Sequence, residues 1–125
     1  MSMTFTVRSP EDLRAKLDRF VQVFPGGVKE ALWDEAHVIM NQSVGQVPVD
    51  TGYLRSTSYV NDPFEEGGKI AIEMGYYANY AAPVHDIDIG HYVGKSHFLS
   101  DPFEMLAPSV MENIVLRVEQ KLGGE

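Results

Sequence analysis

The stretch Val47-Pro48-Val49-Asp50-Thr51-Gly52-Tyr53-Leu54-Arg55-Ser56 lies between a helical pattern before it and a strand pattern after it. Pro48 disfavours helical backbone angles at Val47 and so predicts the end of the preceding helix. Asp50 is a good N-cap, because its carboxylate can accept a hydrogen bond from a backbone N–H two or three residues on. Gly52 allows a backbone angle that a side chain would resist.

Leu54 then supplies an apolar anchor, and Arg55 places a cation beside Asp50. We therefore interpret residues 47–56 as a rigid corner that converts a helix into a strand. The residues of this structural motif are Pro48, Asp50, Thr51, Gly52, Leu54 and Arg55.

Two helical patterns precede the corner. Ser9 as N-cap and Pro10 at the first helical position predict the start of one helix, which the Pro25-Gly26-Gly27 run ends. The second helix is expected over residues 28–44. Its buried stripe is predicted to be Val28, Leu32, Ala36, Ile39 and Ser43. Before both, residues 4–7 alternate polar and apolar, which predicts a short edge strand.

Trp33 lies off the centre of that stripe and has two interpretations. It is either a rim residue of the core or an aromatic side chain that faces a partner.

The pattern after the corner predicts an antiparallel hairpin. Residues 56–60 and 69–74 are its strands, with Ile70, Ile72 and Met74 on one face and a solvated loop over residues 65–68. Residues 76–82 predict a short helix. A last helix opens at Ser100, and Pro108 either kinks it or marks its true start. Its expected buried face is Phe103, Leu106, Val110, Ile114, Val118 and Leu122.

Composition bounds the function. The 125 residues fit a single domain, residues 1–125, and 18 acidic against 10 basic residues give a net charge of −8. A phosphate-gripping protein is normally basic, so sequence-specific nucleic-acid recognition is not expected. There is no cysteine and no apolar run long enough to span a membrane. The first eight residues lack the order of a signal peptide, so we expect a soluble protein made in the cytoplasm.

Asp50-Thr51-Gly52 is also the triplet that surrounds the catalytic aspartate of aspartic proteases. Those enzymes need two such aspartates sharing a proton in an almost wholly β fold, with a small residue after the triplet. Here the bulky Tyr53 follows and helical stretches flank the motif. The capping role of Asp50 is therefore favoured over catalysis.

A second alternative is a small metal-dependent enzyme. Histidine nitrogens and carboxylates gather between His85 and His97 and resemble a divalent-ion site. The residues concerned are His85, Asp86, Asp88, His91 and His97. Their spacing matches no established motif, and such clusters are more often solvated loops, so we expect no metal and no cofactor. The four tyrosines Tyr76, Tyr77, Tyr80 and Tyr92 are expected to serve core and interface packing.

The order of parts resembles the small neck proteins of long-tailed bacteriophages, which are called head–tail connector, head–tail joining, tail-completion or minor capsid proteins. The resemblance covers roughly residues 28–122, and its most specific piece is residues 48–56. Supporting pieces are Tyr77-Ala78, Tyr80-Ala81, and Phe98-Leu99 leading to Pro102.

This resemblance implies an α+β fold in which helices pack on a small antiparallel sheet. It also implies a homo-oligomeric ring at the portal–tail junction of the virion, contacts with other head or tail proteins, DNA passing nearby, and no enzymatic activity. Two departures stand out. Pro83-Val84-His85-Asp86 stands where the family often has a Glu and a Gly-Thr soon after its Tyr-Ala segment. His97 stands where the family usually has a Pro before Phe-Leu.

The loop at residues 83–97 is the predicted contact with those partners. Glycine and proline break regular structure there, and its apolar groups have no periodic face to join, so we expect residues 83–95 to be mobile until assembly. The candidate partner-binding residues are His85, Ile87, Ile89 and Tyr92.

Overall fold

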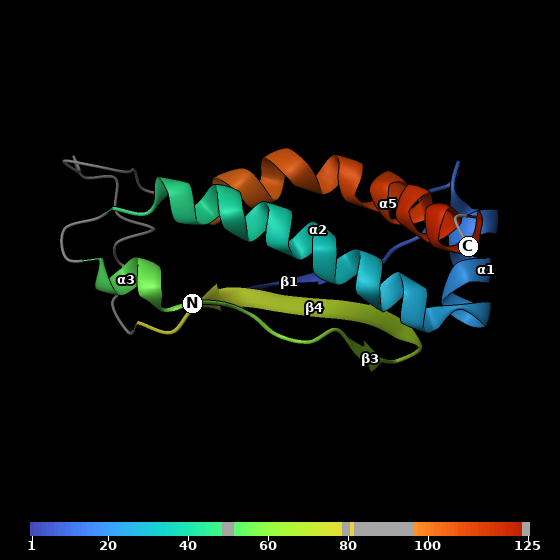
Figure 1. Ribbon diagram of the computed structural model, residues 1–125, viewed down its shortest axis with the longest axis horizontal. Helices are drawn as coiled ribbons and strands as arrows, with labels where there is room; N and C mark the ends of the chain where they lie inside the picture. The colour runs from blue at the N-terminus through green and yellow to red at the C-terminus, as the bar shows by residue number, and fades with distance from the viewer. Residues whose placement is uncertain (49–51, 79–80, 82–96, 124–125) are drawn as a thin grey trace.

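A computed structural model of the chain describes residues 1–48, 52–78, 81 and 97–123. Two long helices pack on one face of a four-stranded antiparallel sheet, so the predicted α+β fold is confirmed (Figure 1). The strands are β1 (Ser2–Thr6), β2 (Ser58–Val60), β3 (Phe64–Glu66) and β4 (Lys69–Tyr76). The helices are α1 (Arg14–Val23), α2 (Pro25–Gln46), α3 (Tyr53–Ser56) and α5 (Ser100–Gly123).

β4 is the centre of the sheet. β1 pairs along one side of it, with Thr4 opposite Glu73, and β2 and β3 pair along the other. The predicted hairpin of residues 56–60 with residues 69–74 is confirmed as the pairing of β2 with β4. Its first strand begins later than predicted, at Ser58, because residues 53–56 form α3.

The loop predicted over residues 65–68 is wrong. Its first part belongs to β3, and only Gly67 and Gly68 form the turn into β4. Their φ angles of 60° and 76° are the left-handed values that a two-residue hairpin turn needs and that glycine adopts without strain. Two glycines side by side therefore close a tight hairpin inside the longer connection.

The inner face of β4 forms the floor of the core. Ile70, Ile72 and Met74 are buried on it, as predicted. Tyr76 continues this alternation as the last residue of β4, so its predicted place in a helix is wrong. The pairing of Tyr76 with Met1 explains the difference, because the two residues exchange backbone hydrogen bonds and extend the ladder.

The two N-terminal helices meet at a different point from the one predicted. Ser9 does not cap α1, because its hydroxyl donates to the Asp18 carboxylate and α1 begins only at Arg14. Pro25 does end α1, but it also starts α2, which runs from Pro25 to Gln46. Proline suits the first helical position, where its missing N–H would have no partner in any case.

α2 and α5 lie side by side and run in opposite directions over the sheet (Figure 1). The whole predicted stripe of α2 is buried. Trp33 is half-buried, packs against the core and lies 4.3 Å, centroid to centroid, from the His37 ring, as a rim residue does.

Pro108 lies inside α5, so it does not mark the start of that helix. Val110, Ile114 and Val118 are buried as predicted, and Phe103 and Leu106 are partly buried against the core. Leu122 is exposed, which corrects the prediction at the end of the stripe. Met111 and Val115 are buried as well, because this helix contacts both α2 and α1. No helix in the described ranges is long and apolar enough to cross a membrane.

Candidate functional site

The corner, residues 47–56, follows α2, and the structure describes all of it except residues 49–51. Val47 is extended, with φ −64° and ψ 135°, and both Val47 and Pro48 are buried. Gly52 then takes a left-handed φ of 77° directly before α3. Most residues resist this angle at a cost of about 1–2 kcal/mol, which explains a glycine here. Leu54 on α3 is buried in the core as the predicted anchor.

The remaining motif positions are not all covered. Asp50 and Thr51 lie outside the described residues, so the capping role of Asp50 stays a prediction. Arg55 is half-exposed, and its Nε atom is buried with no hydrogen-bond partner among the described groups.

Thr57, which sequence reasoning missed, ties the corner to the end of β4. Its hydroxyl donates to the Leu54 carbonyl at 2.8 Å and accepts from the Ala78 backbone N–H at 3.2 Å. Its own carbonyl accepts from the Tyr77 N–H at 3.0 Å. A threonine at the end of a short helix, where its hydroxyl can reach the carbonyl three residues back, is the signal that would have identified it.

Beneath the corner, a buried hydroxyl pair joins α2 to β4. The Ser43 and Tyr76 oxygens are 2.6 Å apart, and the two residues are 0% and 1% exposed. The Tyr76 ring also meets Phe98 edge-on at 5.1 Å, which connects the segment before α5 to the same point. Burial raises the pKa of Tyr76 above its usual value, while the Ser43 hydrogen bond and the charge of Arg55 act in the opposite direction.

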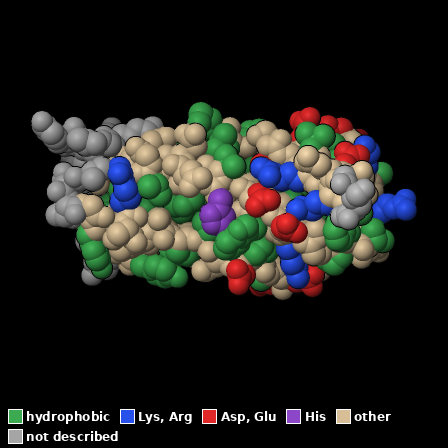
Figure 2. All heavy atoms as spheres, viewed as in Figure 1, with side chains coloured by type: hydrophobic (Ala, Val, Ile, Leu, Met, Phe, Trp, Pro, Cys, Tyr) green, Lys and Arg blue, Asp and Glu red, His purple; other side chains and the backbone are tan. Residues whose placement is uncertain are grey.

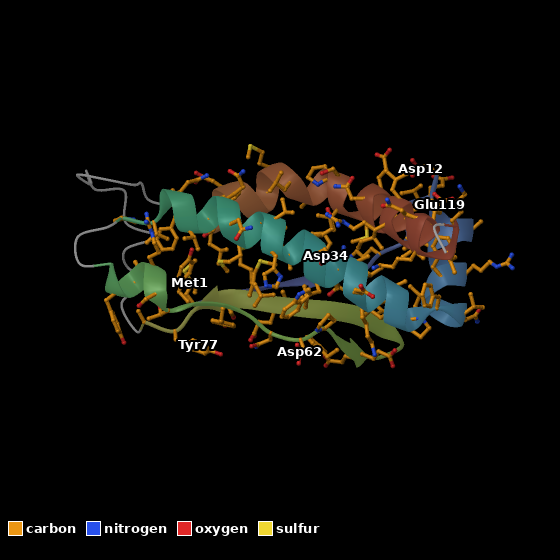
Figure 3. All side chains as sticks on the ribbon, viewed as in Figure 1. Met1, Asp12, Asp34, Asp62, Tyr77 and Glu119 are labelled. Atoms are coloured by element: carbon orange, nitrogen blue, oxygen red, sulfur yellow. The ribbon has the colours of Figure 1, made fainter. Side chains whose placement is uncertain are left out.

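The outer face of the sheet carries an aromatic pair. Tyr59 and Tyr77 stack with ring centroids 4.1 Å apart, and Tyr77 is 69% exposed. Figure 3 places Tyr77 on the side of β4 away from α2 and α5. Burial, and then the nearby Glu73 carboxylate, raise the pKa of Tyr59.

The buried acid of the core is Glu35, which sequence reasoning also missed. Its carboxylate accepts from Asn113 Nδ2 at 2.9 Å and from Arg117 Nε at 2.7 Å. Arg117 also reaches the Asp34 carboxylate at 3.6 Å. Because its charge is paired and its oxygens are hydrogen-bonded, Glu35 serves as a link between α2 and α5 rather than as a free acid or base.

The C-terminal half of α2 has a surface without charged side chains. Residues 36–48 contain no Asp, Glu, Lys or Arg, yet Val38, Asn41 and Gln42 face solvent on α2. On α5, Met105 is 64% exposed. Figure 2 shows most of the charged side chains of this face over the other half, where α1 and the start of α2 lie, and a single Lys or Arg side chain toward the opposite end. We call residues 36–48 the uncharged segment.

The metal and partner candidates of the loop are almost all outside the described residues. This holds for His85, Asp86, Asp88 and His91, for the apolar residues Ile87, Ile89 and Tyr92, and for Tyr80. His97 is described, exposed and has a positive φ of 56°. Within the described ranges, no group of three or more His, Asp or Glu side chains is placed to hold a metal ion.

Comparison of the chain with known protein families, with characterised proteins and with solved structures finds no match in any of the three.

Proposed function

We propose that this protein is a structural assembly component of a bacteriophage neck, where copies of it form part of the ring that joins the portal end of the head to the tail. The observation that carries the proposal is the construction of the corner. Gly52, Leu54 and Thr57 there fix the chain by backbone angle, burial and hydrogen bonds. The described residues of the motif, together with the adjoining Thr57, thus have a structural role, as expected of an assembly protein.

The uncharged segment supports the same proposal. The centres of protein–protein interfaces are depleted in charged residues and enriched in methionine and aromatic side chains. A chain with a net charge of −8 that leaves residues 36–48 uncharged, with Val38 exposed, has a surface of that kind.

The net charge of the chain supports a position beside DNA that does not involve binding to the DNA phosphates. Acidic residues exceed basic ones, and Lys16, Lys121 and Arg117 are already paired with carboxylates of this chain. A chain with such an excess of acidic residues is not attracted to phosphates as a whole and therefore allows DNA to pass.

The proposal is tested by assembly with the products of neighbouring genes. The wild-type protein is expected to co-purify with portal or tail proteins and to form rings visible by electron microscopy. Val38→Glu should keep the fold, because Val38 is exposed, but should abolish ring formation by burying a charge at the interface.

The matched control is Gln120→Glu, which adds the same charge at an exposed position on the charged half of the molecule. It should assemble like the wild type. If the Val38→Glu variant formed normal rings, the uncharged segment would not be part of the interface. If the wild-type protein associated with no head or tail protein, the neck function would be rejected.

A further inference from the structure

β1 is an edge strand whose outer edge is met by no other strand of the described chain. Met1 and Tyr76 exchange two backbone hydrogen bonds, and the Val7 N–H donates to Ile70. Because antiparallel pairs alternate, the odd-numbered residues of this strand direct their backbone groups toward β4. The N–H and C=O groups of Ser2, Thr4 and Thr6 therefore point to the outer edge.

The two edges of the sheet differ in protection. The β2–β3 edge carries the features that block strand addition: Pro63, the acids Asp62, Glu65 and Glu66, and strands of only three residues each. β1, with the sequence Ser-Met-Thr-Phe-Thr, contains no proline and no charge. Of the two edges of the described sheet, the β1 edge therefore lacks the features that block strand addition.

A groove of about 530 Å³ runs beside this open edge. It is lined by Thr4, Phe5 and Thr6 of β1, by Arg8, Ser9 and Pro10 after it, and by Phe103 and Met111 of α5. The Phe5 and Phe103 rings are 5.5 Å apart, centroid to centroid. A strand added to β1 would place its inward side chains over these apolar groups.

We propose that the occupant of this edge is β1 of a second copy, paired antiparallel about a two-fold axis at Thr4. In that register Thr4 faces Thr4 of the second copy and Ser2 faces its Thr6, so each outward backbone group finds a partner. Threonine and serine pair favourably across strands. Met3 of one copy then lies beside Phe5 of the other, and both side chains enter the apolar groove.

The charge distribution permits this contact. Residues 1–10 contain no acid and a single base, Arg8, so the 18 acids and the other 9 bases give the rest of the chain a net charge of −9. The two Arg8 side chains would lie at opposite ends of the paired strands. The contact closes at two copies and is independent of the proposed neck function, because a ring would need a second, different contact on each copy.

Sedimentation equilibrium of the purified protein tests the pairing. The wild type is expected to dimerise with rising concentration. Thr4→Pro deletes an N–H that β4 does not use, so the variant should fold, yet its dimer dissociation constant should rise at least about tenfold because each copy loses an intermolecular hydrogen bond. The control Thr4→Val keeps the N–H and should dimerise within a few-fold of the wild type. A monomeric wild type, or equal dimerisation of the proline variant, would overturn the proposal.

Disulfide trapping tests the register and remains decisive if the proline variant fails to fold. The chain has no cysteine, so single substitutions are unambiguous. Thr4→Cys should cross-link under mild oxidation, because directly opposite Cα atoms lie about 5.5 Å apart. Ser2→Cys should not, because the two copies of residue 2 would be about 14 Å apart in this register. Equal trapping at both positions, or trapping at neither, would refute the two-fold pairing.

Discussion

Replacing Tyr76 by phenylalanine removes the hydroxyl that joins β4 to α2 without changing the ring that meets Phe98. The Ser43 hydroxyl, which is 0% exposed, then loses its partner in the core. A buried polar group left without a hydrogen bond costs about 1–3 kcal/mol. We expect Tyr76→Phe to lower the free energy of unfolding by about 2 kcal/mol, measured by urea denaturation.

A double-mutant cycle isolates this hydrogen bond. Ser43→Ala should cost a similar amount, because it leaves the Tyr76 hydroxyl buried without its partner. Ser43→Ala with Tyr76→Phe removes both polar groups and should cost clearly less than the sum of the single changes. Tyr77→Phe, on the exposed ring of the aromatic pair, is the control and should change stability by less than about 0.5 kcal/mol. Additive single effects would refute a buried hydrogen bond between the two hydroxyls.

Burial of Tyr76 also predicts how the stability of the fold depends on pH. The pKa of Tyr76 is raised in the folded protein, chiefly by burial, above its unfolded value of about 10. Because the folded state favours the neutral hydroxyl, the stability that this pKa shift contributes is fully present below about pH 10. It is lost as the pH rises through the folded pKa. Unfolding measured between pH 9 and 11 should show a smaller loss of stability in Tyr76→Phe than in the wild type. An identical pH dependence would contradict the assigned burial.

Four further substitutions test other contacts of the fold by denaturation. Gly52→Ala should cost about 1–2 kcal/mol, because φ is 77° there; an unchanged midpoint would show that the corner relaxes. Arg117→Met should cost about 3 kcal/mol by leaving Glu35 charged and buried. Lys16→Met, which breaks an exposed ion pair, should cost under about 1 kcal/mol; equal losses in these two variants would refute the buried link. Asp50→Ala should cost about 1 kcal/mol if that residue caps the turn.

The sequence predicted the elements that depend on regular spacing. Alternation placed Ile70, Ile72 and Met74 on one face, and helical spacing placed the buried stripe of α2, because burial on one side imposes these periods. Helix boundaries were less predictable. Pro25 can end one helix or begin the next, and only the packing of α2 decides between them.

Polar contacts in the core were the least predictable part. In the sequence, Glu35 cannot be distinguished from a solvent-exposed acid, because its partners Asn113 and Arg117 are 78 and 82 residues away. The place of Tyr76 in β4 is not predictable from local sequence, because its pairing partner, Met1, is 75 residues away in sequence. Such pairings depend on tertiary structure, which local patterns do not encode.

The most direct test of the neck function is electron microscopy of particles made by the phage or prophage that encodes this protein, after the gene is inactivated. The account predicts DNA-filled heads and separate tails that do not join, with joining restored by the wild-type protein supplied in trans. Complete, infectious virions in the absence of the protein would contradict it.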